Sequence, residues 1–452
     1  MSEQRAPLRP HISVGTTTRF EGAHLNVEAT LPAASPHWPA LLEGSLRAAR
    51  SIAAAVTGGE RLAQAARLVR RSEQGADPWS AWLNAFAALH AVPGWSVQPE
   101  AGEGADVRLR IRCLYVQAVA RWSQLALDLL IIADQARDRP VKIPRVRWAA
   151  RLAGLGVGLP APETMALHAA LGARQLPWRW LGGDRTTIGL GSAQRTISGT
   201  APDPELAADR LAQAKLSIPL YTVTGSVGKT TTTRLLAQLL ETTGLRVGMT
   251  ASDGAWAAGV RLAEGDWIGG MNALVVARRR DVDAMVAELG RRGLFYSGVP
   301  FERSDIAILL NVDNVHIGYE GVDTIEAMAD VKGLTLRPAR LAVLNRDDAN
   351  CMRLGAGRAP ESCVWFSRIA GEDALRALSR EAGGALGVAR TAKGKARALT
   401  IWSAGEQDRA LPLAGVAPFH GMLGEKTLEE LLAAVAAAWF GPVRIEEWDG
   451  LL

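Results

Sequence analysis

The sequence predicts an α/β protein in which a smaller α+β domain precedes a larger domain built on a parallel sheet with helices on both faces. After residue 218, short apolar runs rich in strand-forming residues alternate with helical segments, which is typical of such a sheet. A glycine-rich stretch joins one of these runs to a helix at residues 222–233. Hydrophobic residues make up 48% of the 452 residues, enough to build packed cores and to exclude disorder over most of the chain.

Composition also narrows the function classes. Fifty-one basic and 46 acidic residues leave a formal charge of +5, a small excess that suits anionic small molecules without requiring nucleic acid. The 3 cysteines share no CxxC spacing, which argues against a disulfide framework or a structural zinc site. The amino terminus has no apolar segment, and the two most apolar stretches, 125–134 and 431–440, are much shorter than the ~20 residues that span a bilayer. We therefore expect a cytoplasmic protein with no membrane or nucleic-acid partner.

The domain boundaries follow from changes in sequence texture. Residues 1–170 are predicted to form the N-terminal α+β domain, with an alternating strand at 107–116 and a helix at 118–135. Residues 171–217 are rich in glycine, threonine and polar residues, and are predicted to be a connector with one helix. That helix begins at Asp203-Pro204, where an N-cap residue precedes proline in the first turn.

Residues 218–445 are predicted to form the larger domain, and 446–452 a short tail. A strand, a helix closed by Gly244 and a second strand open this domain as one strand–helix–strand unit. Further segments repeat the pattern: apolar runs at 283–289, 305–312 and 340–345, a helix at 324–336 and an apolar helix within 418–441.

The stretch TVTGSVGKTTTT, residues 222–233, predicts a phosphate-binding loop. In a loop between a strand and a helix, glycines let backbone N–H groups converge on phosphate oxygens at the helix amino terminus. Lys229 would neutralise the phosphates and the Thr230 hydroxyl would bind Mg²⁺. Valine at 223 breaks the longer GxxxxGK[ST] spacing, and the alternative is a chance glycine-rich turn before a helix. The expected nucleotide contacts are Thr224, Gly225, Ser226, Val227, Gly228, Lys229, Thr230 and Thr231.

Several segments together resemble a known family. TGSVGKTTTTRLL resembles the TGTNGKTTT loop of the Mur ligases, which join an acid to an amine with ATP. From 222 to about 348 the chain is similar to the Mur-type half of the cyanophycin synthetases, in VGMTASDGAW, DAMVAELGRRGL, NVDNVHIGYEGVDTIEAMADVKG and LNRDD. The resemblance implies a Mur-type central domain with a P-loop-type parallel sheet, and ATP and Mg²⁺ as cofactors.

A metal site is predicted near the loop. Glu288 ends an apolar strand, and a carboxylate at a strand's carboxyl end lies where α/β proteins bind ligands. His316 matches the family's metal-side histidine, although Val315 stands where the family has aspartate. Thr230, Glu288 and His316 are thus the implied metal ligands. The alternatives are a solvated strand-end carboxylate for Glu288 and a structural role for His316.

Three further residues match family positions. Lys332 matches a lysine that many Mur ligases carry as a carbamate, and is expected to be catalytic with Lys229, Glu288 and His316; the alternative is a lysine favoured by a helix dipole. Asn345 and Asp348 match the nucleotide side, with ordinary turn chemistry as the alternative. The run 278–280 of three arginines is interpreted as a solvated loop rather than a phosphate clamp.

The predicted function is an ATP-dependent acid–amino acid ligase acting through an acyl phosphate, with an amino-acid or peptide-like substrate. The ATP-grasp domain of the cyanophycin synthetases and the closing domain of the Mur ligases have no counterpart in the sequence. We therefore expect a homo-oligomer, or a separate ATP-grasp or closing-domain protein, to complete the site. The alternatives are a non-catalytic or partner-dependent ATP-binding subunit, and a P-loop ATPase switch that would explain only the loop.

Overall fold

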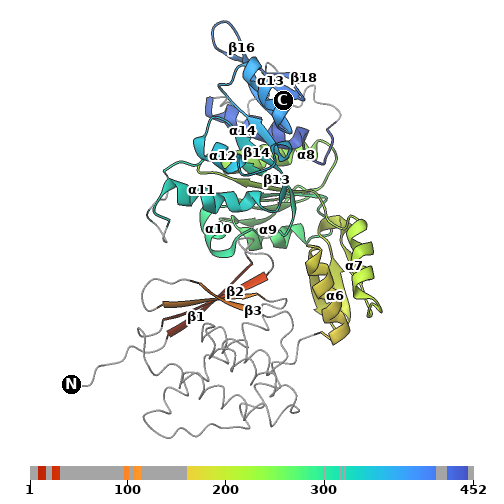
Figure 1. Ribbon diagram of the computed structural model, residues 1–452. Coiled ribbons are helices and arrows are strands. Elements are labelled where there is room, and N and C mark those ends of the chain that lie inside the picture. The colour runs from red at the N-terminus through yellow and green to blue at the C-terminus, as the bar shows by residue number, and fades with distance from the viewer. Residues whose placement is uncertain are drawn as a thin grey trace, which may run out of the picture.

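The computed structural model describes residues 160–299, 301–314, 318, 322–413 and 425–445, together with four strands of the N-terminal part. Those strands form an antiparallel sheet in the order β1-β2-β4-β3 (Figure 1). Its members are β1 (Arg9–Thr16), β2 (Ala23–Thr30), β3 (Ser96–Glu100) and β4 (Asp106–Arg112). Strand β4 overlaps the strand expected at 107–116, while the helix expected at 118–135 lies outside the described residues.

The segment expected to be a connector, 171–217, belongs to a small folded unit with more structure than one helix. The unit begins with α6 at Pro162, so the boundary predicted at 170 falls within a helix. Helices α6 and α7 pack together beside a three-stranded antiparallel sheet, and apolar side chains from the helices and the sheet form a separate core. Helix α7 confirms the predicted start, because Asp203 accepts a hydrogen bond from the Leu206 N–H. The sequence analysis missed the sheet because its strands are only 3–5 residues long. The elements are α6 (Pro162–Ala173), β5 (Trp178–Gly182), β6 (Arg185–Ile188), β7 (Arg195–Ile197) and α7 (Pro204–Gln213).

An 11-stranded sheet forms the larger domain, in the order β11-β10-β9-β12-β8-β13-β14-β15-β16-β17-β18. Its strands are β8 (Leu220–Thr224), β9 (Val247–Ala251), β10 (Gly254–Ala257), β11 (Val260–Glu264), β12 (Ala284–Glu288), β13 (Ser304–Leu309), β14 (Ala339–Asn345), β15 (Cys363–Phe366), β16 (Gly384–Arg390), β17 (Ala396–Ser403) and β18 (Glu406–Pro412). The strands predicted within 283–289, 305–312 and 340–345 are β12, β13 and β14.

The middle of this sheet is parallel, as predicted, and both of its edges are antiparallel. The strands β9-β12-β8-β13-β14-β15-β16, in sheet order, run parallel to one another. Hairpins add β10 and β11 antiparallel beside β9, and β17 and β18 antiparallel beside β16. Short turns allow these reversals, because two antiparallel strands need no helical crossover between them.

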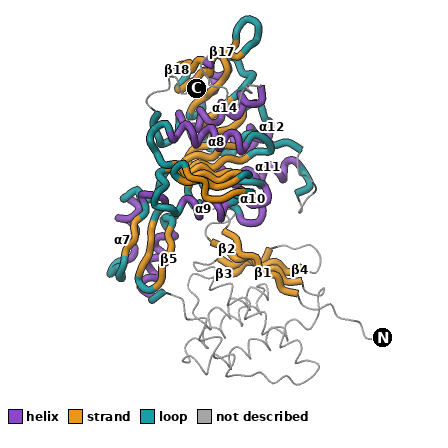
Figure 2. The backbone as a smooth tube through the Cα atoms, turned by 180° about the vertical axis from the view of Figure 1, so that it is seen from behind, coloured by secondary structure: helices purple, strands orange, loops and turns teal. Residues whose placement is uncertain are grey.

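Helices cover both faces of the parallel strands (Figure 2). The larger core joins α8 and α14 to one face, and a second core joins α9, α10, α11 and α12 to the other. Strand β13 shows the alternation, since Ile306 and Ile308 face the first core while Ala307 and Leu309 face the second. The helices are α8 (Lys229–Glu241), α9 (Gly270–Ala277), α10 (Arg291–Ser297), α11 (Ile325–Gly333), α12 (Ala349–Gly355), α13 (Glu372–Glu381) and α14 (Glu425–Trp439). In the part of the chain that the structure describes, no helix is long and apolar enough to cross a membrane.

This topology concentrates the predicted site at one edge of the sheet. Strands β8, β12, β13 and β14 are parallel neighbours or next neighbours, so the residues that follow them meet at their shared carboxyl edge. The glycine-rich loop follows β8, Glu288 ends β12, and Asn345 ends β14.

Candidate nucleotide and metal site

The glycine-rich loop has a backbone that other residues would not adopt easily. Gly228, the N-cap of α8, has φ 88°, in the left-handed region that favours glycine. A Cβ at Gly228 would lie 2.7 Å from the Glu430 Oε1 atom, and one at Gly225 would lie 3.0 Å from the Leu310 Cβ atom. The chain therefore turns tightly into α8. The first N–H groups of this helix lack intrahelical acceptors and can bind an anion.

Two lysines reach the carbonyl groups of this loop. The Lys229 ammonium donates to the Ser226 carbonyl at 3.2 Å, and the Lys332 ammonium donates to the Gly225 carbonyl at 2.8 Å. Burial lowers the pKa of Lys229, with the Glu288 carboxylate acting in the opposite direction. Burial, followed by the positive charges of Lys229 and Arg291, lowers the pKa of Lys332 to about 7. Clustered cations beside a helix amino terminus would attract phosphate.

Thr230 and Glu288 meet as the sequence predicted. The Thr230 hydroxyl donates to Glu288 Oε2 at 2.9 Å and lies 3.0 Å from the Ser252 hydroxyl, whose backbone N–H also donates to Glu288 Oε2. Burial raises the pKa of Glu288, while the hydrogen bond from Thr230 and the charge of Lys229 lower it. A carboxylate and two hydroxyl groups fit Mg²⁺, which prefers oxygen ligands and retains several waters.

Among the described residues, no group of three or more His, Cys, Asp and Glu side chains is placed so that it could hold a metal ion. The predicted third ligand, His316, lies outside the described residues, together with Val315. Of the three predicted metal ligands, the structure describes Thr230 and Glu288. It places the Ser252 hydroxyl beside them, a residue that the sequence did not indicate.

Asn345 and Asp348 make local backbone contacts. The Asn345 side chain accepts from the Asp347 N–H at 2.9 Å. Asp348 caps α12 by accepting from the Cys351 N–H at 2.8 Å, and its other carboxylate oxygen accepts from the Val312 N–H at 3.0 Å. These bonds fit the turn alternative, and contact with nucleotide stays a prediction.

The arginine run at 278–280 lies away from the loop. It precedes β12 and therefore occupies the amino edge of the parallel strands, whereas the loop occupies the carboxyl edge. Arg279 pairs with Asp281, and Arg280 donates to the Thr196 hydroxyl in the small αβ unit. This placement argues against a phosphate clamp. Arg278 is half-buried, and burial lowers its pKa, so the run is solvated only in part.

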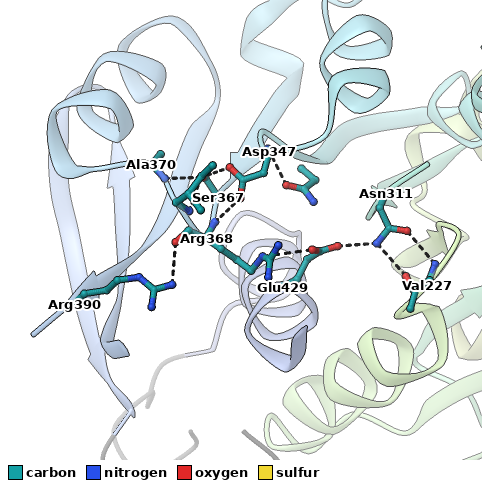
Figure 3. Close-up of polar contacts among 10 residues, drawn as sticks. Val227, Asn311, Asp347, Ser367, Arg368, Ala370, Arg390 and Glu429 are labelled. Carbon is teal, nitrogen blue, oxygen red and sulfur yellow. Dashed lines mark hydrogen bonds and ion pairs between the residues drawn. The ribbon is translucent and has the colours of Figure 1, made fainter. Parts of the chain in front are cut away.

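The structure also reveals a polar network that the sequence analysis missed (Figure 3). Asn311 contacts the loop, Glu429 of α14 contacts Asn311, and Arg368 forms an ion pair with Glu429. The only signal in the sequence was the polar Asn311 at the end of the apolar run 305–312. Glu429 gave none, because charged residues on a helix are usually solvated.

Comparison with known proteins finds a family model and relatives that are similar to the central region. Residues 223–415 match the Mur ligase middle domain. Over 134 residues the chain is 43% identical to cyanophycin synthetase of Geminocystis herdmanii, covering 29% of this chain and 15% of that protein. Over 157 residues it is 31% identical to UDP-N-acetylmuramoyl-L-alanyl-D-glutamate–2,6-diaminopimelate ligase of Pseudomonas syringae pv. tomato, covering 34% and 32%. The resemblance to the Mur ligases and the cyanophycin synthetases is confirmed, and the match spans about 15% of the length of the latter.

Two solved structures are similar to part of the chain. A structure of UDP-N-acetylmuramoyl-L-alanyl-D-glutamate–2,6-diaminopimelate ligase is 21% identical, with a TM-score of 0.38, covering 51% of this chain and 45% of that one. A bifunctional folylpolyglutamate synthase/dihydrofolate synthase with Mn, AMPPNP and L-glutamate bound is 16% identical, with a TM-score of 0.35, covering 52% and 57%.

Proposed function

We propose that the Mur ligase middle domain of this chain binds Mg·ATP and uses it to join a carboxylic acid to the amine of an amino acid or peptide. The observation that carries the proposal is the 2.9 Å contact between the Thr230 hydroxyl and Glu288, placed at the amino terminus of the helix that follows the loop. This arrangement combines N–H donors for phosphate with oxygen ligands for a hard cation. The similarity to cyanophycin synthetases and to a Mur-type ligase supports the same reaction class.

The proposed reaction has two steps. A carboxylate oxygen of the acid attacks the γ-phosphorus of ATP, and the bond to the β,γ-bridging oxygen breaks, so that ADP leaves with the electron pair. The amine nitrogen then attacks the acyl carbon, the bond to the phosphate oxygen breaks, and inorganic phosphate leaves while the nitrogen loses a proton. Bound Mg²⁺ would supply charge stabilisation for the phosphoryl group.

The residues of this chain have distinct proposed roles in that scheme. Thr224 and residues 225–231 cradle the phosphates, and Lys229 neutralises their charge. Thr230, Glu288 and Ser252 would hold the metal, with His316 as a further proposed ligand. Lys332 is a proposed carbamate site, because a pKa of about 7 leaves its amine largely neutral above neutral pH and able to add to carbon dioxide with loss of a proton.

The test is whether ADP and amide form together. The purified chain is incubated with Mg·ATP and a panel of amino acids and dipeptides, ADP is measured by a coupled assay, and products are identified by mass spectrometry. We expect ADP release that depends on an added acid and amine and that Glu288→Gln abolishes. The control Glu406→Gln changes an exposed carboxylate on β18 and should behave as wild type. ADP release that is indifferent to every acid and amine would reject the ligase.

A second candidate is an ATP-binding subunit that needs a partner for turnover. The observation that favours it is Val315, which removes an acidic group that the family carries beside the metal-side histidine. This candidate predicts Mg·ATP binding without amide formation for the chain alone. Val315→Asp then provides the distinguishing experiment, since restored turnover would identify the lost carboxylate as the cause.

A further inference from the structure

Asn311 clamps the tip of the phosphate loop from the carboxyl end of β13. Its side-chain oxygen accepts from the Val227 N–H at 2.9 Å, and its NH₂ group donates to the Val227 carbonyl at 3.2 Å (Figure 3). The Ser226 N–H is shared between the side-chain oxygen and the main-chain carbonyl of Asn311, each at 3.0 Å. This two-sided pairing imitates the backbone pairing of adjacent strands. The pairing holds residues 226–227 in place, and the first N–H groups of α8 stay available to bind an anion.

The clamp works in only one orientation of the Asn311 amide. A reversed amide would place its NH₂ group against the N–H donors of Ser226 and Val227, so neither bond could form. Glu429 of α14 selects the productive orientation, because its Oε1 atom lies 2.7 Å from the Asn311 NH₂ nitrogen. An ionised carboxylate only accepts hydrogen bonds, and a charge-assisted bond is stronger than a neutral one.

Glu429 is in turn held by Arg368, which lies in the segment that follows β15. Its Oε2 atom lies 3.5 Å from the Arg368 Nε atom, and the Arg368 backbone N–H donates to the Asp347 carboxylate at 2.8 Å. Burial raises the pKa of Glu429, the Asn311 hydrogen bond and the Arg368 charge lower it, and the charges of Asp347 and Asp313 raise it. The carboxylate is thus anchored on both of its oxygens.

We propose that Glu429 is a positioning residue of the nucleotide site, which acts through Asn311 to hold residues 226–227 in the conformation that binds phosphate. The inference rests on the proposed ATP binding for its effect on affinity, but not for its effect on the loop. Glu429 lies 118 residues from Asn311 in the sequence, and it reaches the loop because α14 packs beside α8 (Figure 1).

The first experiment needs no nucleotide. Amide hydrogen exchange of Ser226 and Val227 is measured in wild type, Glu429→Leu and Asn311→Ala, with Glu406→Gln as the control. We expect about tenfold or faster exchange of the Val227 N–H in both variants, and a smaller increase at Ser226, whose N–H keeps the main-chain carbonyl of residue 311 as an acceptor. The double variant should show no further increase, because both changes act through one contact. The exchange rate in Glu429→Gln should lie between those of wild type and Glu429→Leu. The glutamine side-chain oxygen can still accept from Asn311, whereas the ion pair with Arg368 is lost.

The second experiment measures Mg·ATP affinity by calorimetry in the same variants. We expect Mg·ATP affinity about tenfold weaker in Glu429→Leu and in Asn311→Ala. The double variant should lose no more affinity than either single variant, and Glu429→Gln should lose less than Glu429→Leu. Wild-type loop exchange in Glu429→Leu, or fully additive losses, would overturn the proposal. If Glu429→Leu does not fold, Arg368→Gln and Glu429→Gln decide by the same readouts. A wild-type chain that binds no ATP would reject the proposed function, while loop exchange would still decide the role of Glu429.

Discussion

The half-buried Lys229, the buried Lys332 and the buried Glu288 determine the charge of the site at the scale of single residues. The charges of Lys229 and Glu288 favour one another's ionised form, whereas the charges of Lys229 and Lys332 oppose one another. Binding phosphate would relieve this repulsion, because an anion favours both ammonium groups. The site is therefore electrostatically prepared for a negatively charged ligand.

Replacing Lys229 with alanine should weaken ATP binding strongly. The change removes a cation beside the loop and leaves the bound phosphates with fewer charge-assisted contacts, which should cost about 1.5–3 kcal/mol. This corresponds to roughly ten- to a hundredfold in the dissociation constant measured by calorimetry with Mg·ATP. Equal affinity in wild type and Lys229→Ala would remove the basis for a phosphate loop, provided that circular dichroism shows both to be folded.

Lys332 should make stability depend on pH in a predictable direction. Burial lowers its pKa from 10.5 to about 7 in the folded protein. Between these values the unfolded chain binds a proton that the folded protein does not, so the free energy of unfolding should rise with pH, by at most about 1.4 kcal/mol per pH unit. Below pH 7 both states are protonated, and this contribution becomes constant.

The comparison variant for this pH dependence is Lys332→Met, which keeps an unbranched side chain without the charge. Urea denaturation of both proteins from pH 7 to 10 should show wild type gaining stability relative to the variant as pH rises. Parallel pH profiles would show that Lys332 does not titrate in this range in the folded protein.

At the scale of elements, hydrogen bonds join the segment that follows one parallel strand to the segment that follows its neighbour. The Asp348 carboxylate caps α12 after β14 and simultaneously accepts from Val312, which follows β13. Gly228 lets α8 begin close to α14, with the Glu430 side chain against its backbone. These contacts, which lie within the chain itself, hold the segments at the carboxyl edge of the sheet in place without a ligand.

Removing the Asp348 carboxylate should therefore affect stability more than nucleotide binding. Asp348→Ala loses a helix cap and leaves the Val312 N–H without its acceptor, which should cost about 1–3 kcal/mol. Both carboxylate oxygens already serve backbone N–H groups, so ATP affinity in the folded variant should stay near that of wild type. Chemical denaturation and calorimetry check the two expectations, with the exposed Asp373→Ala of α13 as the control. A large loss of affinity with unchanged stability would instead support the nucleotide contact.

At the scale of the whole molecule, an acyl phosphate must be protected from water until the amine attacks. The loop and the metal ligands lie at the carboxyl edge of the sheet, where ligands of α/β proteins approach. We propose that a second copy of the chain, or a separate ATP-grasp or closing-domain protein, covers this edge during turnover.

If a second copy of the chain covers the site, turnover should depend on protein concentration. The rate of amide formation per chain should rise with concentration and reach a plateau as dimers form, because only the dimer has a covered site. Activity is measured over a dilution series while light scattering gives the mass at each concentration. A constant rate per chain from a monomer would exclude the second copy, and stimulation by an added partner protein would indicate the separate chain.

The sequence alone determined the α/β class, the strand–loop–helix at 222–233 and the meeting of Thr230 with Glu288, whereas phosphate binding by the loop stays a prediction. These predictions were possible because their signals are local: an apolar run predicts a buried strand, and residues that follow parallel strands meet at one edge. The Mur-type resemblance added Lys332, whose contact with the Gly225 carbonyl the structure supplied. His316 remains a prediction from the sequence.

The tertiary structure alone decided the antiparallel edges of the sheet, the small unit at 162–216 and the route from Glu429 to the loop. Hairpin turns set the antiparallel edges, and the strands of the small unit are too short to show a clear alternation of apolar and polar residues. Glu429 and Asn311 are 118 residues apart, and only the packing of α14 beside α8 brings them within 2.7 Å. A charged residue on a helix gives no signal of its partner, because the partner is set by how the cores pack rather than by the neighbouring sequence.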